Sequence, residues 1–199
     1  MPLQNRVQPT GEIIAHPARG QFMGNRGILH DSDQRLGKAR WRHKAWVTCV
    51  LSFKGRHRAL MRPHNYTELF FLDEAVAFAA GHRPCGECRR ADYNQFRAAA
   101  EVTTPIAAYD AILHAQRAVP RRYEQVRYTA DIAELPDGVF ILSETGAAHL
   151  LWEDKMLPYT PSGYGQPIHR PARGTVTVLT PAPMVQVLQA GYKVQVAQP

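Results

Sequence analysis

The sequence predicts an α+β fold, in which short antiparallel strands and hairpins pack beside three to four helices around a central Cys-x-x-Cys knuckle. Two observations favour this class. Short β-branched or apolar runs end at glycine and proline turns, and a few longer segments carry apolar residues at helical spacing. The length of 199 residues, with 45% hydrophobic and 21% charged residues, suits a single compact domain over residues 1–199.

The first half of the chain contains short strand-like segments separated by turns. Residues 1–34 are broken by glycines and prolines, so we expect mainly irregular structure there. The segments with strand character are residues 12–15, 27–29, 46–53, 58–61 and 66–71. Lys54-Gly55-Arg56 lies between two of these segments, which predicts a β-hairpin that turns at this glycine.

Capping residues mark the boundaries of the expected helices. Asp73 or Thr67 can start a short helix that runs through Ala80, and Gly81 suits the left-handed position that follows it. The other helices are expected over residues 86–101, 104–118 and 181–190.

Residues 135–199 are expected to form a β-rich C-terminal subregion. Its strand-like segments, separated by turns, are residues 139–142, 148–152, 155–157, 174–179 and 192–196.

Cys85 and Cys88 have the spacing of half a zinc site, on a turn that leads into a helix. Unpaired backbone N–H groups and the helix dipole would favour their thiolate forms. Cys49 is the candidate for the third ligand. The candidates for the fourth are His57, His64 and His82. In the alternative interpretation, Cys49 is a buried small apolar residue and the other two thiols are free.

The segment between Gln34 and Thr67 contains nine Lys or Arg residues and no Asp or Glu. Such a local positive field favours polyanions, and Trp41 and Trp46 within it could stack on bases. A solvated basic surface without a partner is the alternative. The candidate contacts to nucleic acid or phosphate are Arg26, Arg40, Arg42, Lys44, Arg56, Arg58, Arg89 and Arg117.

An aromatic strand at Phe70-Phe71, an alanine-rich helix and Gly81-His-Arg-Pro-Cys-Gly-Glu-Cys88 follow one another in the sequence. Residues 69–90 thereby resemble the zinc-binding domain of the Ada adaptive-response DNA repair protein. The resemblance implies zinc at Cys85 and Cys88, a zinc-knuckle subregion over residues 45–101, and a domain that sits on the DNA backbone. That family also has an upstream Cys-x-x-x-Cys, one thiol of which accepts a methyl group. Here the region offers Cys49 alone, so we do not expect dealkylation.

Two further clusters contain acid–base residues. Asp110, His114 and Arg117 have the spacing of one helix face, where a carboxylate can orient an imidazole and a guanidinium can bind phosphate. His30 and Asp31 lie in a glycine-bracketed loop and could bind a divalent metal or transfer a proton. Ordinary helical ion pairs and turn chemistry explain the same residues without catalysis.

These patterns lead to one leading hypothesis and two alternatives. The leading hypothesis is a cytoplasmic, zinc-containing protein associated with DNA or RNA, in repair or nucleic-acid processing. The first alternative is a phosphodiesterase-like hydrolase, metal-dependent or acid–base, that uses His30, Asp31, Asp110 and His114 on a phosphorylated ligand. The second is a structural or protein-interaction module. We expect no membrane partner, because no apolar run is long enough to cross a bilayer and the N-terminus lacks a secretory signal.

Overall fold

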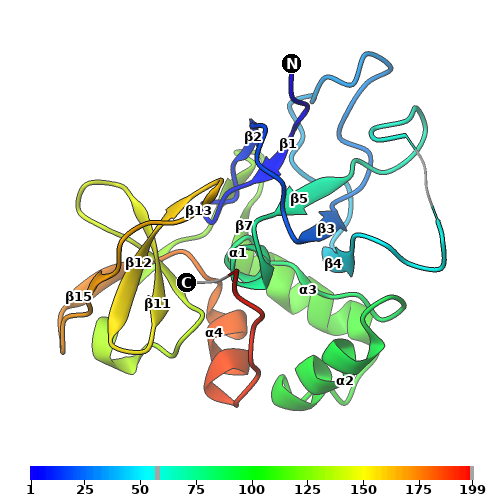
Figure 1. Cartoon of the computed structure of the whole chain (residues 1–199). Coiled ribbons are helices and arrows are strands. Elements are labelled where there is room, and N and C mark those ends of the chain that lie inside the picture. The colour runs from blue at the N-terminus through cyan, green and yellow to red at the C-terminus, as the bar shows by residue number, and fades with distance from the viewer. Residues whose placement is uncertain (57–58, 198–199) are drawn as a thin grey trace.

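The computed structural model describes residues 1–56 and 59–197 and confirms the α+β class (Figure 1). The helices of this part of the chain are α1 (Glu74–Ala79), α2 (Arg90–Ala99), α3 (Ile106–Arg117) and α4 (Ala182–Gln189), with a short 3-10 helix at Ile132–Glu134. Among the described residues, no helix combines the length and the apolar character needed to cross a lipid bilayer.

The first sheet has the strand order β2-β1-β5-β3-β4-β6. Its strands are β1 (Gln4–Val7), β2 (Ile13–Ala15), β3 (Phe22–Asn25), β4 (Val47–Val50), β5 (Leu69–Phe71) and β6 (Arg83–Pro84). Two neighbouring pairs, β1 with β5 and β4 with β6, run parallel, and the other pairs are antiparallel. The sheet therefore joins segments that are far apart in the sequence.

The hairpin expected around Gly55 is not seen in the described residues. β4 ends at Val50, and it pairs with β3 along its length on one side and with β6 at Val47 and Thr48 on the other. Residues 59–61 are irregular, and Arg58, at the start of the expected second strand, lies outside the described residues. The strands expected at residues 27–29 and 192–196 are also absent, and both segments are irregular.

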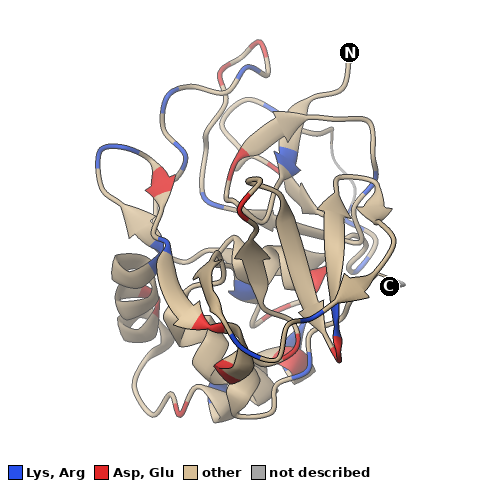
Figure 2. Cartoon of the chain, turned by 90° about the vertical axis from the view of Figure 1, so that its left-hand side faces the viewer, with Lys and Arg blue, Asp and Glu red and all other residues tan. Residues whose placement is uncertain are grey.

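The second sheet has the order β13-β12-β11-β10-β15-β9, with β14 also paired to β12, and all its pairings are antiparallel. Its strands are β9 (Tyr128–Asp131), β10 (Phe140–Leu142), β11 (Ala148–Trp152), β12 (Lys155–Thr160), β13 (Gly163–Tyr164), β14 (Ile168–His169) and β15 (Thr175–Val178). A small separate hairpin is formed by β7 (Ala118–Val119) and β8 (Glu124–Gln125). Figure 2 shows that charged residues lie mainly in loops and at the ends of elements, while the strands of the second sheet are largely uncharged.

Helix α1 lies at the centre of the molecule, with the first sheet on one side and the second sheet on the other (Figure 1). All six of its residues are buried, and its alanines allow close packing. One hydrophobic cluster runs from Val7 in the first sheet through α1 to Leu150 in the second sheet and Val187 in α4. The two sheets therefore share one core.

The expected caps of α1 are confirmed. The side chain of Asp73 accepts a hydrogen bond from the backbone N–H of Val76 at 2.9 Å, and Gly81 follows the helix with a φ of 78°. Asp73 also accepts hydrogen bonds from the Tyr164 hydroxyl at 2.7 Å and the Ala197 N–H at 3.0 Å. This one carboxylate thus joins α1 to the second sheet and to the C-terminal segment.

Candidate functional site

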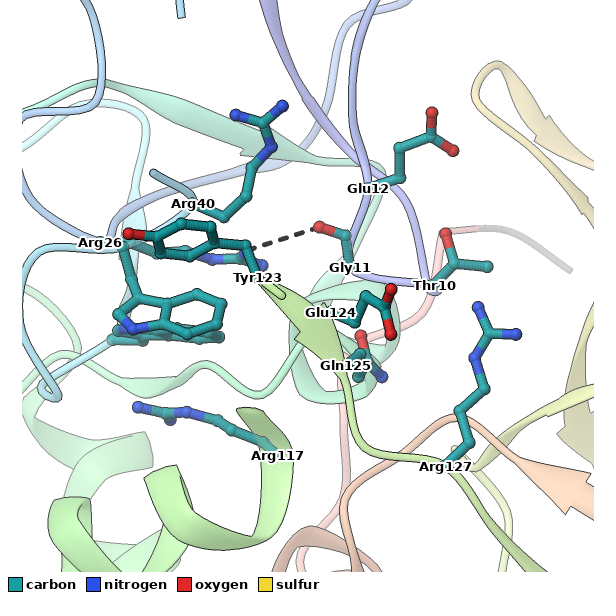
Figure 3. A pocket seen from close by; sticks show the side chains of 12 residues that line it. Thr10, Gly11, Glu12, Arg26, Arg40, Arg117, Tyr123, Glu124, Gln125 and Arg127 are labelled. Atoms are coloured by element: carbon teal, nitrogen blue, oxygen red, sulfur yellow. Dashed lines mark hydrogen bonds between the residues drawn. The ribbon is translucent and has the colours of Figure 1, made fainter. Parts of the chain in front are cut away.

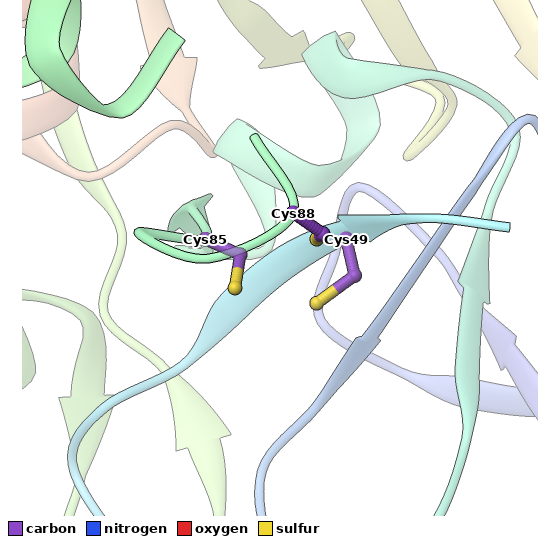
Figure 4. A group of neighbouring side chains, drawn as sticks. All are labelled: Cys49, Cys85 and Cys88. Carbon is purple, nitrogen blue, oxygen red and sulfur yellow. The ribbon is translucent and has the colours of Figure 1, made fainter. Parts of the chain in front are cut away.

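A cluster of three cysteines lies where β4 and β6 run side by side. β4 carries Cys49, and the parallel pairing of β6 brings the knuckle to the same place, since the Cys85 N–H donates to the Thr48 carbonyl at 2.9 Å. The sulfur atoms of Cys49, Cys85 and Cys88 all lie within 4.8 Å of one another (Figure 4). Within the described residues this is the one group of three or more His, Cys, Asp or Glu side chains arranged to hold a metal ion.

The sulfur separations suit a soft metal ion. In a tetrahedral zinc site with Zn–S bonds of ~2.3 Å, neighbouring sulfur atoms are ~3.8 Å apart, which is within the 4.8 Å limit of this cluster. The side chains come from a strand and a turn that are hydrogen-bonded to each other, which limits how far the three thiols can separate. The donor set therefore fits a soft or borderline metal ion in kind and supplies three ligands to it.

The three thiols have different proton affinities. A hydrogen bond from the Cys49 thiol lowers the pKa of Cys85 to about 5, and the backbone N–H of Glu87 assists, donating to the Cys85 sulfur at 3.4 Å. The pKa of Cys49 is raised by the same hydrogen bond and by burial, and burial raises the pKa of Cys88. The expected preference for thiolate thus agrees with the lowered pKa of Cys85 and not with the raised pKa of Cys88, where burial and the neighbouring Cys85 outweigh one backbone hydrogen bond from Val50.

The described histidines do not complete this cluster. His82 is fully buried, with its Nε2 accepting a hydrogen bond from Arg26 at 3.2 Å and its ring centroid 4.6 Å from that of Phe71. His64 is exposed on a loop and does not belong to the cluster. His57 lies outside the described residues. The protein donors placed around the site in the described chain are thus the three cysteine sulfurs.

The cysteine cluster lines a groove of about 780 Å³, which we call the cysteine groove. Its charged residues are Arg6, Arg19, Arg56, Glu68 and Glu87, and its aromatic residues are Phe53, Tyr66 and Phe70. The Arg6 guanidinium carbon lies 4.8 Å from the Phe70 ring centroid, and Arg56 forms an exposed ion pair with Glu87 at 2.9 Å. Sequence reasoning missed Arg6 and Arg19, because only the pairing of β1 with β5 brings the N-terminal segment beside the knuckle.

Three of the predicted phosphate-binding residues meet in a second cavity of about 620 Å³, the arginine pocket. Arg26, Arg40 and Arg117 line it together with Trp41, Trp46, Tyr123 and Arg127 (Figure 3). Among the described residues, it shares no lining residue with the cysteine groove.

The other predicted phosphate-binding residues are dispersed. Arg42 and Lys44 are exposed on the loop before β4. Arg89 is buried and forms ion pairs with Glu74 at 2.8 Å and Asp92 at 2.9 Å, so its guanidinium stabilises the core and does not face a ligand. Arg58 lies outside the described residues.

The predicted catalytic residues do not converge. Asp110 forms a buried bidentate ion pair with Arg83, with both N···O distances 2.7 Å, and no hydrogen bond in the described chain joins it to His114. His114 packs edge-on against Trp41 and Trp46, and burial lowers its pKa to about 4.

The other two predicted catalytic residues lie elsewhere. His30 Nδ1 lies 2.6 Å from the Thr67 hydroxyl, and Asp31 accepts hydrogen bonds from the backbone of its own turn. Both line a separate cavity with Arg42. The acid–base site expected from the sequence is therefore not assembled in the described chain.

No protein-family model, curated protein sequence or solved structure matches this chain. Its fold and its site define it as an α+β protein with a three-cysteine cluster that could hold a metal ion.

Proposed function

We propose that this protein is a zinc-binding, nucleic-acid-associated protein. In this proposal Cys49, Cys85 and Cys88 hold the metal ion, and the cysteine groove beside it takes a single-stranded polyanion. The observation that carries the proposal is the convergence of three sulfur atoms within 4.8 Å at the wall of a groove that also contains three arginines and three aromatic rings.

The donor chemistry supports the metal. Cysteine thiolates select soft and borderline ions, and a metal ion bound here would displace the protons that the cluster now shares. All three cysteines are free thiols, as expected for a protein kept in a reducing compartment such as the cytoplasm. The likeness of residues 69–90 to the Ada zinc domain agrees with this role, with the thiols here holding the metal and accepting no methyl group.

The groove chemistry supports the polyanion. Guanidinium groups bind phosphates, and aromatic faces accept bases of any sequence, so the combination suits single-stranded nucleic acid. The exposed basic residues of the neighbouring loops, among them Lys54 and Arg62, add a positive field that would attract a polyanion from solution. The formal net charge of the chain is +7.

The metal is tested by elemental analysis and by cobalt substitution. The purified wild-type protein should hold about one equivalent of zinc, and its cobalt form should show sulfur-to-metal charge transfer. Cys85→Ser should lose both properties, while the surface variant Arg90→Gln should keep them. Less than about half an equivalent of zinc in wild-type protein prepared without chelators would remove the metal from the proposal.

The polyanion is tested by measuring affinity for single-stranded DNA and RNA over a range of salt concentrations. Removing one phosphate contact with Arg19→Gln should reduce the slope of log K against log salt by about 0.7, and Arg90→Gln should leave it unchanged. Binding that is absent, or that does not respond to salt, contradicts this half of the proposal and leaves the metal site unaffected.

One observation favours metal-dependent hydrolysis as a second candidate function. The described chain supplies three ligands to the cluster, and catalytic zinc sites commonly combine three protein ligands with a water molecule whose pKa the metal lowers. Here the groove arginines would bind the phosphodiester. Hydrolysis of bis(p-nitrophenyl) phosphate by the zinc-loaded protein, lost in Cys85→Ser, would support this function, and equal rates in both proteins would refute it.

A further inference from the structure

Two buried guanidinium groups lie on one indole ring in the arginine pocket. The guanidinium carbons of Arg26 and Arg117 are 4.2 Å and 4.0 Å from the ring centroid of Trp46. The two residues are only 2% and 1% exposed. Figure 3 shows Arg40 above Arg26 and Arg117 below it, all three along the wall of the same cavity. Two cations are therefore brought together around one aromatic side chain.

Neither guanidinium has a carboxylate partner among the described residues. Arg26 donates to His82 Nε2 at 3.2 Å, to the Gly11 carbonyl at 3.4 Å and to the Ala80 carbonyl at 3.3 Å. Arg117 donates to the backbone carbonyls of Gly81 and Lys44, and its Nε has no hydrogen-bond partner. Buried charges are ordinarily paired, so this arrangement leaves positive charge to be neutralised from elsewhere.

The pKa shifts of these residues also indicate that, in the described chain, the cluster carries positive charge without an acidic partner of its own. Burial and then Arg40 lower the pKa of Arg26 to about 9, and burial followed by Arg26 lowers the pKa of Arg117. Asp110 opposes this effect at Arg117, but both of its carboxylate oxygens are already bonded to Arg83. The pKa of His82 is lowered by burial and by Arg26, so the imidazole stays neutral. Within the described residues, no carboxylate forms an ion pair with Arg26 or Arg117.

The cavity next to these cations has the size and lining of a small-molecule site. Its volume of about 620 Å³ falls within the range usual for such sites. Trp41 and Tyr123 form a pair of rings at its wall, with centroids 4.9 Å apart. Glu12, Glu124 and Arg127 line the end away from the arginine cluster, where the charges are mixed (Figure 3). The anionic end of a ligand would therefore be held at the arginine cluster, with its neutral, planar end against the rings.

We propose that the arginine pocket binds a small phosphorylated compound of the mononucleotide class, with its phosphate group on Arg26 and Arg40 and its ring on Trp41 or Tyr123. Guanidinium groups match phosphate oxygens in geometry, and two of them can neutralise a dianion, while the charge of Arg117 behind the indole adds to the positive field. The site is separate from the cysteine groove and does not depend on the function proposed for it, since the two cavities share no described lining residue.

The test is calorimetric titration of the full chain with three probes at constant ionic strength: inorganic phosphate, adenosine monophosphate and adenosine. The monophosphate should bind saturably, inorganic phosphate should bind more weakly and compete with it, and adenosine should not bind measurably. No saturable binding of either phosphate-containing probe, or equal binding of adenosine and its monophosphate, would overturn the proposal.

Arg40→Gln is the decisive variant. Arg40 is only half-buried, and its side chain bonds to the backbone carbonyls of Gly37 and Lys38 in its own loop, so the fold should survive its replacement. Loss of one charge-assisted contact should weaken binding of both phosphate-containing probes about tenfold or more. Arg90→Gln, at an exposed position on α2, is the matched control and should bind like wild type.

Two further variants separate the parts of the site. Arg26→Gln should weaken binding like Arg40→Gln if its circular dichroism spectrum remains that of the wild type, and Arg40→Gln alone decides the matter if Arg26→Gln does not fold. Tyr123→Ser should weaken the binding of adenosine monophosphate and leave the affinity for inorganic phosphate unchanged. Wild-type affinity for the phosphate probes in Arg40→Gln would refute the assignment of the phosphate to this cluster.

Discussion

The buried ion pair between Arg83 and Asp110 offers a test of whether Asp110 is a structural residue. Both N···O distances are 2.7 Å, and the side chains are only 6% and 3% exposed. Asp110→Asn keeps the shape of the side chain but leaves the guanidinium without its counter-charge. Removing one partner of a buried ion pair costs about 3–5 kcal/mol of unfolding free energy. Because the amide oxygen introduced by Asp110→Asn can still accept a hydrogen bond from Arg83, we expect a loss near the lower figure.

The expected loss of about 3 kcal/mol corresponds to a fall in Tm of about 6–12 °C for a chain of this size. Thermal and urea unfolding, followed by circular dichroism at pH 7, measure it. The matched control is Asp33→Asn, since Asp33 forms an ion pair of 3.9 Å with Arg35 in which both side chains are exposed. Such pairs contribute at most about 1 kcal/mol. If Asp110→Asn costs no more than Asp33→Asn, the structural role is refuted.

Replacing both Arg83 and Asp110 tests whether the loss of stability comes from the unpaired buried charge. In the double variant Arg83→Met with Asp110→Leu, no buried charge is left without a partner. We expect the double variant to lose less unfolding free energy than the two single variants lose in sum. Burying two apolar side chains costs less than burying one charge that has no partner.

Three further predictions follow from the site and its surroundings. In metal-free protein, the low pKa of Cys85 (about 5) should make Cys85 the first thiol that iodoacetamide alkylates. The alkylation rate, followed by peptide mass spectrometry, should be nearly constant from about pH 6 to 8 and should fall below about pH 5. A rate that rises about tenfold per pH unit above pH 6 would contradict this prediction. Burial lowers the pKa of His114 to about 4 from its usual 6.5, so as the pH falls below about 6.5 the unfolded chain binds a proton that the folded state does not, and stability is lost. His114→Gln should therefore lose less unfolding free energy than wild type between pH 7 and 4.5, and equal losses would be inconsistent with this reasoning. Gly81→Ala should lower the free energy of unfolding in urea by at least about 1 kcal/mol, because the φ of residue 81 is 78° and a Cβ would lie 2.5 Å from Cδ of Arg117. A variant as stable as wild type would contradict this prediction and show that the turn adapts to a Cβ.

Local sequence signals predicted the helices and most of the longer strands of the second half, but they missed β1 and β3 in the first 34 residues, where irregular structure was expected. The capped helix after Asp73, the helices that follow proline or end near glycine, and most strands of the second half appear close to their expected positions. These signals work because they depend only on neighbouring residues. A capping side chain accepts hydrogen bonds from the N–H groups of its own helix, and a glycine adopts a positive φ without the help of distant residues.

The hairpin at Gly55 failed for the opposite reason. Its prediction used only neighbouring residues, whereas the partners of β4 come from β3 before it and β6 after it. The pairing of strands depends on which distant segments the fold brings alongside. Arg89 shows the same limit for a side chain, since its burial and its pairing with Glu74 could not be read from the basic residues around it.

The sequence by itself determined that the chain is an α+β protein, that Cys85 and Cys88 share a knuckle, and that the loops before and after β4 are basic. Only the tertiary structure decided which groups meet. The parallel pairing of β4 with β6 places Cys49 at the knuckle, and the packing of α3 brings Arg117 to the same indole as Arg26. The physical reason is that residue type sets what a side chain can bind, while burial against distant segments sets which partner it has and at what energetic cost.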